Sequence, residues 1–337
     1  MKIVLFVFLF GPLGLAAQAP QAAVRIGAPN ADSRSGQAQD AVGAAVLGFL
    51  PGPGPLELSA ILGVFGAARL GNPVAAPKTA TRLYVSTGQQ YALVEQNSDA
   101  PLAVWDPAAE NGELTAIPGA LPHPDLVRFS PRGDSAALYA RESGRIQIIG
   151  GMPNQPELRK TLPLLSPSAA SMIAVSDDAN VVIIRDSAGD VLISNDGKNW
   201  QAFSGAYSPL AWTFVPKTHD LIVGDQQENA IFLIEQAGSN SARIVLSENS
   251  LPDQISVTRD GQTLVALDSK RATLWTIDLK KRMSKGATPA SNLHTLSILR
   301  GGNTFLASSQ DTNVTLLKVS EGGGMQMSVL PVTAGER

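Results

Sequence analysis

The chain has 337 residues, of which 26 are Lys or Arg and 29 are Asp or Glu, so its formal net charge is −3. Charged residues make up 16 % of the sequence, against roughly a quarter in typical soluble domains. This composition argues against nucleic acid as a partner, because nucleic acid requires a basic surface. The absence of cysteine excludes disulfides, thiolate metal ligands, a cysteine nucleophile and lipid attachment through cysteine.

The first 19 residues have the features of a secretory signal peptide. Lys2 supplies a positive charge, residues 3–15 form an apolar segment interrupted by Gly and Pro, and small residues follow. Cleavage after Ala16, Ala17 or Ala19 fits this pattern, and a retained anchor is the alternative. Residues 20–44 are rich in Ala, Ser, Gly and Gln, which predicts a flexible leader. No later segment is apolar enough for a membrane helix, so we expect a protein exported to the periplasm, the cell surface or the extracellular space.

A β-branched or aromatic segment followed by a tight polar turn recurs from about residue 80 onward. Successive copies begin at intervals of about 40 to 45 residues, a spacing typical of propeller blades. The copies are Val85–Gln89, Phe129–Asp134, Val175–Asn180, Phe214–His219, Val257–Gln262 and Ile298–Asn303.

Two further short apolar segments follow each of these turns, and none of them has helical periodicity. The sequence therefore predicts an all-β fold, a β-propeller of four-stranded antiparallel blades, in one domain over residues 45–333. Six complete repeats are recognisable. Residues 46–62 resemble the third and fourth strands of a further blade, so either six blades carry an added N-terminal hairpin or a seventh blade takes strands from the leader. We favour six blades, with seven as the alternative.

The turns identify a superfamily. Ser130-Pro131-Arg132-Gly133 and Thr258-Arg259-Asp260-Gly261 resemble the Ser-Pro-Asp-Gly turn of secreted bacterial propellers of the WD-like and YVTN type. Trp105-Asp106 ends a third strand, where WD repeats carry their dipeptide. The Gly-His pair of eukaryotic WD repeats is absent. The resemblance implies a propeller fold and does not specify a ligand.

One hairpin is similar to the Asp-box of sialidase-type propellers. It contains Ser194, Asp196, Gly197 and Trp200 within Ser194–Trp200. The resemblance implies a structural role, in which the aspartate caps turn amides and the tryptophan packs beneath the turn. It does not imply a sialidase, because no arginine cluster for a sialic acid carboxylate is recognisable.

The turns between second and third strands, with the connections between blades, form the propeller face that usually carries a site. Candidate residues for a ligand on this face are His123, Glu142, Asp186, Asp225 and Asp268. A ring of such carboxylates could hold Ca²⁺, which prefers oxygen ligands. The alternative is that the acids bind their own turn amides and keep the surface polar. The three histidines do not have zinc-ligand spacing.

No nucleophile elbow, phosphate loop or His-Glu-x-x-His motif occurs, and we assign no catalytic or metal residues. The leading hypothesis is an exported, non-catalytic propeller that serves as a binding or scaffold module for a protein, peptide or glycan, without a cofactor. This hypothesis rests on fold analogy. The alternative is a metal-dependent hydrolase of lactonase type, in which channel-facing carboxylates hold a divalent cation that activates water.

Overall fold

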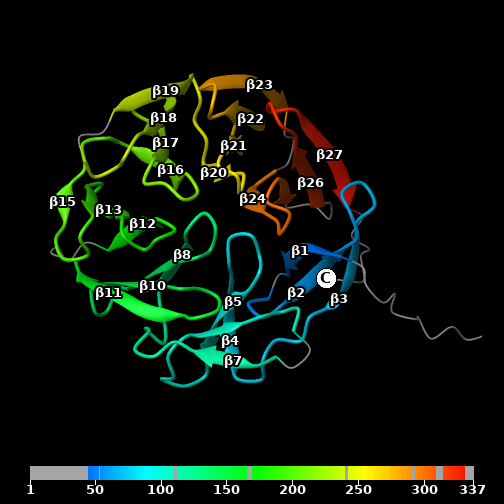
Figure 1. The fold of residues 1–337 in the computed structure, drawn as a ribbon, viewed down its shortest axis with the longest axis vertical. Helices are drawn as coiled ribbons and strands as arrows, with labels where there is room; N and C mark the ends of the chain where they lie inside the picture. Colours follow the sequence, from blue (N-terminus) through cyan, green and yellow to red (C-terminus); the bar gives the residue numbers. More distant parts are fainter. Residues whose placement is uncertain are drawn as a thin grey trace, which may run out of the picture. The chain divides into compact units, whose positions relative to one another are not determined.

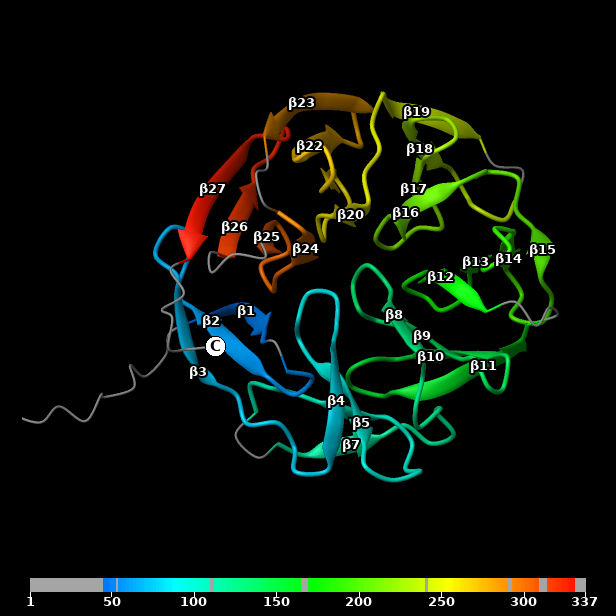
Figure 2. The ribbon, with the colours of Figure 1, turned by 180° about the vertical axis from the view of Figure 1, so that it is seen from behind.

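The computed structural model describes residues 45–52, 54–109, 112–164, 169–239, 242–289, 293–308 and 314–330. The predicted signal peptide and leader lie outside these residues. The described residues form 27 β-strands in seven antiparallel sheets and no helix. The sheets are the blades of a ring around a central channel (Figure 1), and the reverse view shows the same arrangement (Figure 2). The predicted β-propeller fold is confirmed. The ring has seven blades, so the alternative count is the correct one and the favoured count of six is wrong, because residues 46–73 form a blade of the ring.

Six blades have four strands each, which follow one another from the channel outward in chain order. The second blade contains β4 (Ala80–Val85), β5 (Ala92–Gln96), β6 (Ala103–Trp105) and β7 (Leu114–Ala116). The third contains β8 (Leu126–Phe129), β9 (Ala136–Ala140), β10 (Arg145–Gly150) and β11 (Glu157–Pro163). The fourth contains β12 (Ala170–Val175), β13 (Val182–Asp186), β14 (Val191–Ser194) and β15 (Gln201–Ala202).

The fifth blade contains β16 (Pro209–Phe214), β17 (Leu221–Asp225), β18 (Ala230–Ile234) and β19 (Arg243–Glu248). The sixth contains β20 (Gln254–Val257), β21 (Thr263–Asp268), β22 (Thr273–Asp278) and β23 (Met283–Pro289). The seventh contains β24 (Thr295–Ile298), β25 (Thr304–Ser308), β26 (Val314–Val319) and β27 (Met325–Leu330).

Hydrophobic burial between neighbouring blades forms the core. All residues of β17 and β18 are buried, as expected for strands covered on both faces by adjacent sheets. The outer strand β11 instead alternates between exposed and less exposed residues, because one of its faces meets water. One apolar cluster joins Ile222 and Leu233 of the fifth blade to Leu264 and Ile277 of the sixth.

The recurring polar turns connect the first and second strands of the six complete blades. In the third blade Ser130 N–H donates to the carbonyl of Ser135 at 2.9 Å, and Gly133 closes the turn with a φ of +77°. A second bond links this turn to the loop after the third strand. In the third blade, the carbonyl of Asp134, which precedes the second strand, accepts a bond from Met152 N–H of that loop. We call this side of the ring the first-turn end and the opposite side the second-turn end.

The first blade has three described strands, β1 (Val46–Pro51), β2 (Leu58–Leu62) and β3 (Arg69–Pro73). Ala45 O, just before β1, accepts a bond from Gly63 N–H after β2 at 2.9 Å. The equivalent bond in the third blade, from Met152 N–H to Asp134 O, lies between the start of the second strand and the end of the third. β1 and β2 are therefore the second and third strands of this blade, and β3 is its outer strand. The predicted assignment of residues 46–62 as third and fourth strands is wrong by one strand.

The described part of the first blade has no innermost strand, and its neighbours close the ring in its place. Gln89 and Arg300 come from the first turns of the second and seventh blades. The amide oxygen of Gln89 accepts a bond from Phe49 N–H of β1 at 2.5 Å, and Arg300 N–H donates to Leu47 O at 3.0 Å. Arg300 also donates from Nε to Gln89 O at 2.9 Å, and its guanidinium lies 5.0 Å from the centre of the Phe49 ring. These contacts join the seventh blade to the second across the gap.

Candidate functional site

A cavity of about 890 Å³ occupies the central channel. The inner strands β4, β8, β12, β16, β20 and β24 line it, and in the first blade the loop between β1 and β2 takes the place of an inner strand. Leu83 N–H of β4 donates to Pro55 O of this loop at 3.2 Å. The volume is within the range of small-molecule sites.

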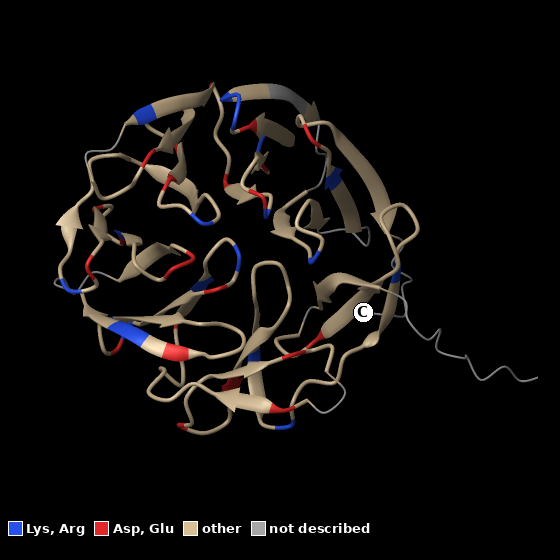
Figure 3. Ribbon diagram, in the orientation of Figure 1, with Lys and Arg blue, Asp and Glu red and all other residues tan. Residues whose placement is uncertain are grey.

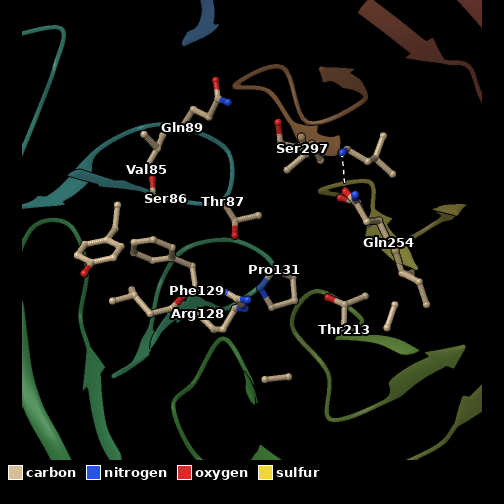
Figure 4. A pocket seen from close by; sticks show the side chains of 18 of the residues that line it. Val85, Ser86, Thr87, Gln89, Arg128, Phe129, Pro131, Thr213, Gln254 and Ser297 are labelled. Carbon is tan, nitrogen blue, oxygen red and sulfur yellow. Dashed lines mark hydrogen bonds between the residues drawn. The ribbon is translucent and has the colours of Figure 1, made fainter. Parts of the chain in front are cut away.

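The inner strands place mostly small side chains on the channel wall near the first-turn end. Two residues before the first turn, the complete blades carry Tyr84, Arg128, Ala174, Thr213, Ser256 and Ser297, all of which line the cavity. Arg128 is the long, charged member of this set. Figure 4 shows Arg128, Thr87, Thr213 and Ser297 around one opening. These residues were not predicted as site residues from the sequence, although they occupy equivalent positions when the repeated turns are aligned.

Gln254 spans two blades on the same wall. Its amide oxygen accepts a bond from Leu296 N–H of β24 at 2.7 Å, and its amide nitrogen donates to the carbonyl of His294. The Gln254 side chain, from β20, thereby forms hydrogen bonds with backbone groups at the inner edge of the next blade (Figure 4). This contact fixes the wall of the channel between the sixth and seventh blades.

The three predicted aspartates lie at the second-turn end, each in a different blade, and they are buried. Asp186 is 5 % exposed, Asp225 0 % and Asp268 2 %. Asp186 accepts bonds from Ala188 N–H and Asp190 N–H at 2.9 Å each, and Asp268 accepts one from Arg271 N–H at 2.8 Å. Asp225 is bonded to four backbone amides. The three carboxylates therefore accept hydrogen bonds from backbone amides of the surrounding loops, which is the alternative to a calcium-binding role for these acids.

His123 and Glu142 are also at the second-turn end. His123 Nδ1 lies 3.0 Å from the Glu95 carboxylate, whose other oxygen accepts a bond from the Tyr84 hydroxyl at 2.9 Å. Burial and the bond to Glu95 raise the pKa of Tyr84 to about 12, against the opposing effect of Arg82. Glu142 is exposed. The structure does not bring the five predicted residues into one cluster, and within the described ranges no group of three or more His, Asp or Glu could hold a metal ion.

The Asp-box-like hairpin connects β14 to β15, the third and fourth strands of the fourth blade. Asp196 Oδ1 accepts bonds from Lys198 N–H at 2.8 Å and Asn199 N–H at 3.0 Å. Gly197 has a φ of +67°, which favours glycine. Trp200 packs against the apolar cluster between the third and fourth blades, and its indole N–H donates to Pro163 O at 2.9 Å. The contacts are those of a structural turn.

We expect this turn to open in acid. Bonds from the Asn199 and Lys198 amides lower the pKa of Asp196 from 3.8 to about 2. Because the folded-state pKa is depressed, the contribution of this carboxylate is complete above about pH 4 and is lost as the pH falls toward 2. The amide proton shifts of Lys198 and Asn199, followed by NMR, should titrate with a midpoint near that lower value. They should not titrate in Asp196→Asn, and a midpoint near that of a free aspartate would contradict the assignment.

Charges of both signs are interspersed over the ring, and several inner loop tips carry Lys or Arg beside Asp or Glu (Figure 3). Arg132 and Lys217 belong to the first turns of the third and fifth blades, on either side of the fourth blade that carries Asp177. The Asp177 carboxylate accepts a bond from the backbone N–H of Lys217 at 2.8 Å and from that of Arg132 at 2.9 Å. Asp177 thus joins the first turns of the third, fourth and fifth blades. No helix of the described residues is long and apolar enough for a membrane crossing.

No protein-family model matches the sequence, and no curated protein matches it either. The structure is similar to a functionally unknown protein from Desulfotomaculum acetoxidans, with a TM-score of 0.56 and 17 % identity over 86 % of this chain and 100 % of that one. A candidate 6-phosphogluconolactonase from Bacteroides fragilis has a TM-score of 0.55 and 11 % identity over 85 % and 94 %. PorZ, a surface component of the type IX secretion system of Porphyromonas gingivalis, has a TM-score of 0.54 and 14 % identity over 86 % and 38 %. At these identities the similarity concerns the fold.

Proposed function

We propose that this chain is an exported binding module that holds a protein, peptide or glycan segment in its central channel. The observation that carries the proposal is the cavity of about 890 Å³, with inner strands of six blades on its wall. Hydroxyl groups of Thr213, Ser256 and Ser297 line it together with the apolar side chains of Phe129 and Trp212. Few polar groups among apolar walls are typical of sites that orient a ligand by hydrogen bonds.

Filling the channel tests this proposal. Ser256→Trp and Ser297→Trp each place an indole in the cavity, so binding to defined arrays of short peptides and oligosaccharides should fall below detection. Thr115→Trp, at an exposed position of the outer strand β7, is the matched control and should bind as the parent does. All variants should melt within a few degrees of the parent. Unchanged binding by both channel variants would place the site elsewhere and overturn the proposal.

A further inference from the structure

Arg128 is a cation on the channel wall that has no ionic partner among the described residues. Of the described residues that line the cavity, it is the only Lys or Arg. Its Nη1 donates to the carbonyl of the adjacent Val127 at 3.0 Å, and no carboxylate in the described part of the chain forms an ion pair with it. The residue is exposed and lines the channel, and partial desolvation by the surrounding protein lowers the pKa of Arg128. An arginine remains charged under such conditions.

Of the described residues that line the cavity, two are carboxylates, and both are at its other end. Arg128 lies two residues before the first turn of its blade, whereas Asp253 precedes β20 and Glu57 precedes β2, both at the second-turn end. Asp253 accepts bonds from the backbone and the hydroxyl group of Ser269. The Glu57 side chain lies against Gly52 and Gly54 of its own loop. A Cβ added at Gly52 would be only 2.6 Å from Glu57 Oε2. Neither position compensates the charge of Arg128.

The fifth, sixth and seventh blades supply hydrogen-bond donors to the same channel wall. Ser256 and Ser297 occupy the same strand position as Arg128 in the sixth and seventh blades, and their hydroxyl groups make no hydrogen bond with another described residue. Thr213, at this position in the fifth blade, bonds only weakly to the adjacent carbonyl of Phe214, at 3.3 Å. A guanidinium offers two parallel N–H donors that match the geometry of a carboxylate, and hydroxyl groups elsewhere on the wall can bind other polar atoms of the same ligand.

We propose that the channel binds a ligand through a carboxylate group placed at Arg128, with the hydroxyl groups of Thr213, Ser256 and Ser297 facing the rest of the bound group. The inference rests on the proposed binding function and specifies its ligand class. A single guanidinium, with Asp253 and Glu57 in the same channel, favours a singly charged carboxylate over a doubly charged phosphate. The carboxylate could be that of an acidic sugar or of a peptide C-terminus.

Two matched probe pairs test the inference on the full chain. Glucuronate is compared with glucose, and acetyl-trialanine with a free C-terminus is compared with its C-terminal amide, by calorimetry and ligand-observed NMR at constant ionic strength. We expect at least one acid to bind roughly ten- to a hundredfold more tightly than its neutral partner, as is typical for hydrogen bonds to a charged group. The pair that shows the difference distinguishes the sugar from the peptide source.

Variants then assign the difference to Arg128. Arg128→Met should abolish the preference for the acid, and Arg128→Lys should retain part of it, because lysine keeps the charge without the planar donor pair. Arg159→Met, on the outer strand of the same blade, is the matched control and should retain the full preference. The melting temperature of Arg128→Met should not fall, since the substitution removes an unpaired, partly desolvated charge.

The outcomes separate the two proposals. If both acids bind no better than their neutral partners, or if Arg128→Met keeps the preference, the carboxylate inference is wrong. If binding of acid and neutral probes is equal and Ser256→Trp removes both, the channel is the site but its ligand is not selected by charge. If Ser256→Trp leaves the binding of every probe unchanged, the channel is not the site and both proposals fail. Absence of any acid binding in the millimolar range also overturns the carboxylate inference.

Discussion

Removal of the first blade, by deletion of residues 1–75, should abolish folding to a stable monomer. Phe49, Leu58 and Ile61 are 1 %, 2 % and 0 % exposed, and they belong to the two apolar clusters that join this blade to the second and seventh blades. Burial of three such side chains stabilises by about 6–15 kcal/mol at 2–5 kcal/mol each, which equals the whole stability of many domains. The deletion would also expose the faces of two blades and favour aggregation.

Two controls make this expectation specific. Deletion of residues 20–42 leaves all described strands in place, and we expect its melting temperature to remain within a few degrees of the parent value. Ile61→Ala keeps the whole blade and should cost about 2–5 kcal/mol by leaving a cavity. The measurements are thermal melting, denaturant unfolding and size-exclusion chromatography. A monomeric protein without residues 1–75 that melts close to the parent would show that six blades close the ring alone.

The repeat period and the turns were sufficient to predict the propeller, because each complete blade carries its own polar turn and apolar strands. The first blade was harder to assign. β3 (Arg69–Pro73) contains Gly, Asn and Pro, which are depleted in strands, and its residues are largely exposed. It is a strand because the edge of β2 offers hydrogen-bond partners. The register of β1 depends on bonds donated by Gly63 and Arg300 and on a bond that Gln89 accepts, and distant contacts of this kind leave no local pattern in the sequence.

The candidate site was only partly predictable. Residue type and turn position drew attention to Asp186, Asp225 and Asp268, but sequence alone does not distinguish an acid that faces a ligand from one that caps amides. Burial of all three favours the second role. Arg128, by contrast, was not predicted as a site residue, because a single arginine in a strand does not by itself indicate a ligand. It becomes noticeable only when its strand position is compared with Ala174, Thr213, Ser256 and Ser297, the small residues at this position in the fourth to seventh blades.

Asp225→Ala should be among the most destabilising substitutions in the ring. Asp225 Oδ2 accepts bonds from Tyr207 N–H at 2.7 Å and Ser208 N–H at 2.9 Å, which belong to the connection before β16. Its Oδ1 accepts bonds from Gln227 N–H at 2.9 Å and Glu228 N–H at 3.2 Å, in the turn between β17 and β18. Alanine would leave these four donors without their acceptor, and a buried donor without a partner costs about 1–3 kcal/mol.

Local rearrangement and water should recover part of this cost, so we expect a loss of about 2–4 kcal/mol in the free energy of unfolding and a melting temperature lower by roughly 3–8 °C. Asp225→Asn should lose less, because one amide oxygen can still accept. Asp106→Ala is the control. Asp106 is exposed, accepts a bond from one amide, that of Ala108 at 2.8 Å, and forms a surface ion pair with Arg300 at 3.8 Å, so its loss should cost about 1 kcal/mol or less. Equal costs for Asp225→Ala and Asp106→Ala would show that the buried carboxylate does not hold the two loops together. Asp225 would then again be open to the role of a ligand residue at the second-turn end.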